Sequence, residues 1–156
     1  GILNHATLMA ELDYAIAFAQ RHGEPLCFLM LDLDHFKRIN DTHGHLVGDQ
    51  VLVHVARIFR KAIRGSDLLG RYGGEEFGII LRKCPPANGR ATAEKLRLAL
   101  ADSPITLPGS DPIPLHVSIG VGAFPGSGTT ATTVAEAADQ ALYKAKSSGR
   151  NRVEMG

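Results

Sequence analysis

Apolar residues recur along the chain with two different periods, and these periods predict alternating helices and strands. A spacing of three and four residues is typical of one helix face, while strict alternation or a short continuous apolar run is typical of a strand. The helical spacing occurs in residues 8–19, 51–63, 93–100 and 134–145, and the strand patterns in 26–33, 77–81 and 113–123.

Shorter pieces between these segments complete the predicted fold. Residues 35–41 form a short helical piece that Asp34 could cap, and Gly48-Asp49 opens the long helix after it. Residues 125–133 are rich in Gly, Ser and Thr and are expected to be a loop, and residues 150–153 an edge strand. The order of elements indicates an α/β domain with a mixed, mostly antiparallel central sheet flanked by helices on both faces.

Two glycines and two glutamates interrupt the apolar pattern between residues 69 and 77. The pair Gly73-Gly74 predicts a β-hairpin, because such a turn needs backbone angles that glycine adopts at low cost. The tip would then carry Glu75 and Glu76. Adjacent glutamates repel each other, so on this stretch alone a solvated tip and a functional site remain equally open.

A second pair of carboxylates changes that balance. Asp32 and Asp34 end the apolar run 26–33, and their alternation places them on the same face of a strand. If this strand pairs with the hairpin, Asp32 and Glu75 meet at one edge of the sheet. Such a carboxylate cluster suits Mg²⁺, which takes oxygen ligands and keeps positions for water and substrate phosphates.

Composition sets broad limits on the class of protein. The chain has 156 residues, of which 44% are hydrophobic and 21% charged, which fits one globular domain with its own core. The net charge of +1 argues neither for nor against a nucleic-acid or anionic lipid partner. Cys27 and Cys84 are far apart in sequence, so we expect buried, reduced thiols in a cytosolic protein. The abrupt start at Gly1 suggests a domain excised from a longer chain.

Four motifs in order resemble the GGDEF domain family, in its GGEEF form. The resemblance covers nearly the whole chain, which is identified as a single catalytic domain, residues 1–156, with an input domain expected before it. The start of the family's opening motif is missing. The matching motifs are Asp32–Lys37 (DxDxFK), Asn40–Asp49, Arg71–Phe77, and Ala141–Lys146 followed by Gly149–Asn151.

The resemblance implies a fold and a reaction. The fold is a palm-like α/β domain, similar to nucleotidyl cyclase palms, and the activity is that of a diguanylate cyclase, which converts two GTP into cyclic di-GMP and two pyrophosphates. Asp32, the Leu33 carbonyl and Glu75, with Glu76 beside them, are expected to hold Mg²⁺, with Mn²⁺ as an alternative. Glu75 is also expected to be the base for the 3′-hydroxyl, which makes Asp32 and Glu75 the catalytic pair.

The resemblance also implies a set of substrate-binding residues. Asp49 would accept from the guanine N1–H and N2–H₂ groups, with Asn40 completing that edge, and Lys37, Lys146 and Arg150 would bind phosphates. The full set is His35, Phe36, Lys37, Asn40, His45, Asp49, Gly73, Gly74, Lys146 and Arg150.

Structural alternatives stay open for several of these residues. Lys37 would otherwise be a solvated lysine, and Lys146 and Arg150 would otherwise pair with the end of a helix dipole. Asp49 would otherwise be a helix cap, and His45 would stabilise a loop. Arg71 has no assigned function beyond bracing the hairpin.

A feedback site is expected upstream of the hairpin. Arg64 and Asp67 form an RxxD placed five residues before Gly73, which matches the inhibitory product site of the family. The alternative is a helix-end arginine beside a turn aspartate. The expected partners are GTP, cyclic di-GMP and a second copy of the domain, with no nucleic acid and no membrane contact by this domain. The expected location is cytoplasmic, with any membrane anchor of the full chain elsewhere.

Two other functions remain in competition with the cyclase. One is a degenerate module that binds GTP or cyclic di-GMP as a signal, although Asp32, Gly73, Gly74, Glu75 and Glu76 are all present. The other is a cyclase with an adenine-containing product. Asp49 argues against it, because adenine lacks the two donors that this carboxylate would read.

Overall fold

Helices and strands follow one another in the predicted order. The computed structural model describes residues 2–156. Its elements are α1 (His5–His22), β1 (Leu26–Leu33), α2 (Phe36–His43), α3 (His45–Ala62), β2 (Leu68–Arg71), β3 (Glu76–Arg82), α4 (Pro86–Ala101), β4 (Val117–Phe124), α5 (Ala131–Ser147) and β5 (Val153–Met155).

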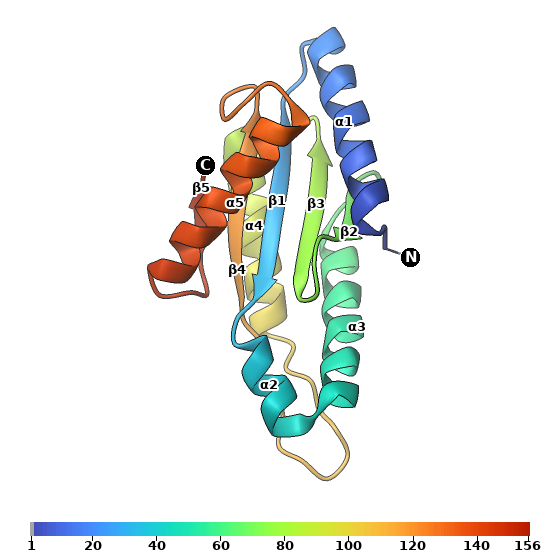
Figure 1. Cartoon of the computed structure of the whole chain (residues 1–156), viewed down its shortest axis with the longest axis vertical. Coiled ribbons are helices and arrows are strands. Elements are labelled where there is room, and N and C mark those ends of the chain that lie inside the picture. The colour runs from blue at the N-terminus through green and yellow to red at the C-terminus, as the bar shows by residue number, and fades with distance from the viewer. Residues whose placement is uncertain (1) are drawn as a thin grey trace.

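The strands form one mixed sheet in the order β2-β3-β1-β4-β5 (Figure 1). All pairings are antiparallel except β4 with β5, which confirms the predicted sheet type. The apolar faces of α1 and α5 pack on one side of the sheet, and those of α3 and α4 pack on the other. The central strand β1 is buried along its whole length because helices cover both of its faces.

The end of β1 and the turn between β2 and β3 lie at the same end of the sheet, next to α2 (Figure 1). The register places Asp32 directly opposite Glu76, so both belong to one rim. The hairpin was predicted, but the backbone reason for its glycines was wrong. Neither Gly73 nor Gly74 has a positive φ, because a four-residue loop, 72–75, spreads the reversal over more residues than a tight turn does.

Element starts differ from the prediction where prolines or capping groups intervene. The strand expected from residue 113 begins at Val117, and Ile113 instead forms an isolated bridge with Ile105. Pro114 has no N–H to donate to a sheet ladder. Helix α5 begins at Ala131 rather than Val134, because the side chains of Thr130 and Thr133 form a reciprocal capping box.

Helix α3 also begins earlier than predicted, at His45 instead of Gly48-Asp49. Its N-cap is Gly44, and no side chain makes the capping bond. Cys27 and Cys84 are free and buried, as expected. Within residues 2–156, the helices lack the length and apolarity that a bilayer span requires.

Candidate active site

Asp32 and Glu75 lie together at the end of the sheet, where the strand pairing was predicted to bring them. The Leu33 N–H donates to the Glu75 carbonyl at 3.3 Å, which ties the end of β1 to the hairpin loop. Both carboxylates line the same cavity, of about 400 Å³. The cavity therefore has an acidic centre built by two chain segments more than 40 residues apart.

Cationic side chains surround this acidic centre. Lys37 and Arg38 come from the first turn of α2, Lys146 from the last turn of α5, and Arg150 from the segment after it. His35, Phe36, Asp34 and Asp41 complete the lining with Leu33. A cavity with carboxylates at its centre and four Lys or Arg side chains at its wall is suited to a metal-bound phosphate chain.

Burial controls the charge state of the carboxylates. Asp32 is only 4% exposed, and this burial raises its pKa against the opposing effect of Lys146, whose Nζ donates to its Oδ2. Burial and the nearby charge of Asp32 also raise the pKa of Glu75 and of Glu76, while Lys146 lowers both. Lys146 is thus a counter-ion that all three carboxylates share.

Glu76 lies at the rim without lining the cavity. A Cβ added at Gly73 would be 3.0 Å from Glu76 Oε1, so this carboxylate rests over the hairpin turn. The charge of Asp139 on α5 contributes to the raised pKa of Glu76. Gly73 is half-buried for this reason, while Gly74 is exposed with open space around it.

The donor set fits a hard divalent cation with few protein ligands. Among residues 2–156, no group of three or more His, Cys, Asp or Glu side chains is placed to hold a metal ion. Asp32, Glu75 and the backbone of Leu33 nevertheless supply oxygen atoms to one cavity. Mg²⁺ suits such a site, because it is usually bound by one or two carboxylates and keeps waters or phosphate oxygens.

Asp34 does not cap α2, contrary to the sequence prediction. The N-cap of α2 is His35, in the left-handed region with φ 58°, and it makes no side-chain capping bond. The Asp34 carboxylate instead accepts from Ser118 Oγ at 2.6 Å and from the Asn151 N–H at 2.9 Å. Asp34 therefore joins β1 to β4 and to the segment after α5.

The residues predicted to read guanine lie apart from this cavity. Asn40 packs against Gly48, where an added Cβ would come within 1.8 Å of Asn40 Oδ1. That oxygen is buried and has no hydrogen-bond partner among the described residues. Asp49 is exposed in the second turn of α3, so the alternative that it caps the helix is wrong. His45 is exposed at the start of the same helix.

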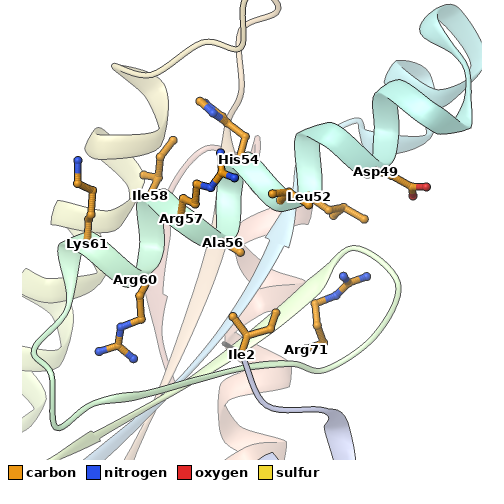
Figure 2. Close-up of a pocket in the computed structure, with 11 residues that line it drawn as sticks. Ile2, Asp49, Leu52, His54, Ala56, Arg57, Ile58, Arg60, Lys61 and Arg71 are labelled. Carbon is orange, nitrogen blue, oxygen red and sulfur yellow. The ribbon is translucent and has the colours of Figure 1, made fainter.

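Asp49 lines a second, larger hollow of about 950 Å³ along α3 (Figure 2). Leu52 lies next to it, and Arg60 and Lys61 lie further along the same helix. Ile2 and Arg71 form the opposite side. Arg71 also donates to the carbonyls of Gly73, at 3.4 Å, and Gly74, so it braces the hairpin as the sequence suggested.

Arg64 and Asp67 form a closed ion pair at the other end of β3. Arg64 Nη2 lies 2.9 Å from Asp67 Oδ1 and donates to the Arg82 carbonyl at 2.8 Å. Asp67 is 1% exposed, while more than half of the Arg64 side chain is exposed. Arg60, which the sequence analysis did not single out, donates to the Asp67 carbonyl at 2.9 Å.

Sequence reasoning also missed two residues of the active-site cavity. Arg38 and Asp41 line it from α2, although neither was assigned a role. The position of Arg38, directly after Lys37 at the start of the helix, was a usable signal. The partnership of Asp34 with Ser118 and Asn151 had no local signal, because these residues are 84 and 117 positions away.

Comparison with known proteins gives consistent results over the whole chain. The family model described as "Diguanylate cyclase, GGDEF domain" matches residues 1–152. Diguanylate cyclase DgcP of Pseudomonas aeruginosa is 43% identical over 155 residues, which are 99% of this chain and 23% of that protein. The chain spans 23% to 40% of the length of the first curated relatives that it matches.

Solved structures show the same fold. The GGDEF domain of YfiN from Pseudomonas aeruginosa superposes with a TM-score of 0.96 at 32% identity, covering 100% of this chain and 97% of that one. The GGDEF domain of DgcB from Caulobacter crescentus, solved in complex with c-di-GMP, gives a TM-score of 0.92 at 35% identity, with 99% and 91% covered.

Proposed function

Because this chain belongs to the GGDEF domain family of diguanylate cyclases, we propose that it condenses two GTP molecules into cyclic di-GMP and two pyrophosphates. One observation carries the proposal. Asp32 and Glu75 share a cavity whose wall holds Lys37, Lys146 and Arg150. This combination matches the needs of phosphoryl transfer, in which positioning and charge stabilisation do most of the work.

We assign metal binding to Asp32, Glu75 and the Leu33 carbonyl. Bound Mg²⁺, or Mn²⁺ in its place, would lower the pKa of the attacking hydroxyl and offset charge on the α-phosphate. Glu76 adds negative charge at the rim, because it lies opposite Asp32 in the sheet register without lining the cavity.

Glu75 is the base that accepts the proton of the 3′-hydroxyl. Burial and the charge of Asp32 raise its pKa. A carboxylate whose pKa is raised is a better proton acceptor, since the optimum for a general base lies near the working pH. Glu75 comes from the loop before β3, so the hairpin sets its position.

Phosphate and base recognition use different parts of the surface around α2 and α3. Lys37, Lys146 and Arg150 bind the phosphate chain, and His35 and Phe36 contribute the start of α2 beside it. Asp49 accepts from guanine N1–H and N2–H₂ at the edge of the α3 hollow. Asn40, whose Oδ1 is buried and has no hydrogen-bond partner among the described residues, completes the recognition of the same edge. Gly73, Gly74 and His45 complete the proposed substrate-binding set, and the space around Gly74 is open.

Synthesis requires two copies of the domain. The proposed site holds one nucleotide, whereas the product contains two, so two domains must face each other across a two-fold axis. Product feedback at Arg64 and Asp67 is the second part of the proposal. The exposed guanidinium of Arg64 can form a bidentate contact with phosphate or guanine.

An incubation with GTP and Mg²⁺, resolved by chromatography, tests the reaction. Cyclic di-GMP should form with the wild-type chain and not with Asp32→Asn or Glu75→Gln. Glu136→Gln is the matched control, because it removes a charge from the exposed side of α5 outside the cavity. Binding of GTP without product would indicate a sensor module instead, and an adenine-containing product from mixed nucleotides would indicate a different cyclase.

A further inference from the structure

The segment after α5 has an unusual backbone. Gly149, Arg150 and Asn151 are three consecutive residues with positive φ, at 122°, 65° and 45°. Side-chain residues visit this region rarely, and then as single residues, because the Cβ crowds the following carbonyl. Strained residues of this kind persist only where surrounding contacts hold them, and they are concentrated at functional sites.

Asp34 supplies one of the contacts that hold this segment. Its Oδ2 accepts the Asn151 N–H at 2.9 Å, and its Oδ1 accepts from Ser118 Oγ at 2.6 Å. Ser118 is fully buried on β4, so the carboxylate is oriented by a rigid part of the sheet. The Arg150 N–H donates to the Ala145 carbonyl at 2.9 Å, which fixes the other side of the turn.

Segment 149–151 places Arg150 at the cavity. Arg150 lines it together with Asp32 and Glu75, and its charge acts on Asp32. The position of the guanidinium depends on the backbone that carries it, since a relaxed turn would move the start of the side chain. Both oxygens of Asp34 meanwhile accept hydrogen bonds, one from Ser118 and the other from Asn151.

We propose that Asp34 is a positioning residue that acts through Arg150. It holds the strained Arg150–Asn151 turn, with Ser118 as its support, so that Arg150 meets the substrate phosphates. The proposal rests on the function assigned above, since it takes the ligand of Arg150 to be a nucleotide phosphate chain. The two aspartates of the DxD motif then have different roles: Asp32 lies at the centre of the cavity, and Asp34 holds the turn that carries Arg150.

Calorimetric binding of a non-reacting GTP analogue tests this role without requiring turnover. Asp34→Ala should weaken binding by roughly 10- to 100-fold, by analogy with the loss seen when a group that orients a metal-ligating side chain is removed. Arg150→Ala should weaken it to a similar extent. The double variant should bind no more weakly than either single variant, because Asp34 acts through Arg150. Additive losses would overturn the proposal.

Conservative variants separate positioning from metal binding. In Asp34→Asn, the amide oxygen can still accept from Asn151, and the amide N–H can donate to Ser118 Oγ, so binding should be largely restored. Mg²⁺ affinity without nucleotide should fall far less in Asp34→Asn than in Asp32→Asn, because Asp34 acts on the metal only through its charge beside Asp32. A loss of Mg²⁺ affinity as large as that of Asp32→Asn would instead show that Asp34 is a metal ligand.

Ser118→Ala provides an independent variant if Asp34→Ala does not fold. It should weaken analogue binding less than Asp34→Ala, while Ser127→Ala should leave binding unchanged. Ser127 is the matched control, because its Oγ makes backbone hydrogen bonds to Ala123 and Gly156 away from the cavity. Equal effects of the two serine variants would overturn the proposal. Failure of the proposed reaction would appear separately, as absence of product from GTP with intact analogue binding.

Discussion

Lys146 is the counter-ion of the acidic cluster, and replacing it should change how the site binds metal. Its Nζ donates to Asp32 Oδ2, and its charge lowers the pKa of Asp32, Glu75 and Glu76. The same ammonium is proposed to bind phosphate once the nucleotide arrives. A cation bound at Asp32 and Glu75 must therefore displace Lys146 or tolerate its repulsion.

The size of this competition can be estimated. Two unit charges 4 Å apart interact by about 1 kcal/mol in water and about 4 kcal/mol at an effective dielectric constant of about 20, and a divalent ion doubles these values. The Lys146 side chain is 36% exposed, so we take the lower end of the doubled range, about 2 kcal/mol, which is roughly 30-fold in affinity. Lys146→Met should therefore bind Mg²⁺ roughly 30-fold more tightly than wild type without nucleotide, and should bind a non-reacting GTP analogue more weakly.

Calorimetric titration with Mg²⁺ measures the effect. It is best done at about pH 8, because the loss of Lys146 raises the pKa of Asp32 further and a proton would otherwise compete with the metal. Lys144→Met is the matched control: it removes the same charge from α5, but its Nζ lies 3.9 Å from Glu154, away from the cavity. The reasoning is refuted if Lys146→Met binds Mg²⁺ no more tightly than Lys144→Met.

Three further predictions concern recognition, assembly and feedback. Asp49→Ser should lower the preference for GTP over ATP in competition binding, since a site built to pair with a substrate group can reject an analogue lacking it by as much as ~10⁴–10⁵; an unchanged ratio would remove Asp49 from base recognition. Specific activity should fall on dilution below the dimerisation constant, and a constant value for a chain that sediments as a monomer would exclude the two-domain arrangement. Arg64→Ala should keep the initial rate and abolish the slowing of progress curves as product accumulates, whereas unchanged slowing would place the product elsewhere.

The hydrophobic pattern was sufficient for the order and type of the elements, because helical and strand periods are properties of neighbouring residues. It was insufficient for their starts, which depend on single groups. The Thr130–Thr133 capping box begins α5 earlier than the apolar pattern does. Pro114 delays β4, although the alternation continues through it. At Gly44, α3 begins without any side-chain cap that a sequence could reveal.

The candidate site was also predictable only in part. The meeting of Asp32 and Glu75 was predictable, because it depends on a single strand pairing. One strand ends in carboxylates, and the hairpin that pairs with it carries the others. The partners of each carboxylate were not predictable from spacing. Asp32 pairs with Lys146 and Asp34 with Ser118, contacts that span 114 and 84 residues. Alternation placed both aspartates on one strand face, but only tertiary packing gives them different neighbours.

The two ends of β3 keep the proposed catalytic site apart from the proposed feedback site. Glu75 immediately precedes this strand, while Arg64 contacts the carbonyl of Arg82, its last residue. The seven residues of β3 extend over roughly 20 Å at about 3.3 Å per residue, so product bound at Arg64 would not occupy the space of GTP bound at Glu75. The strand is also held between β1 and β2 in a close-packed sheet. A shift along such a strand would disturb the core on both faces. Feedback is therefore expected to change how two domains face each other, and to be non-competitive with GTP.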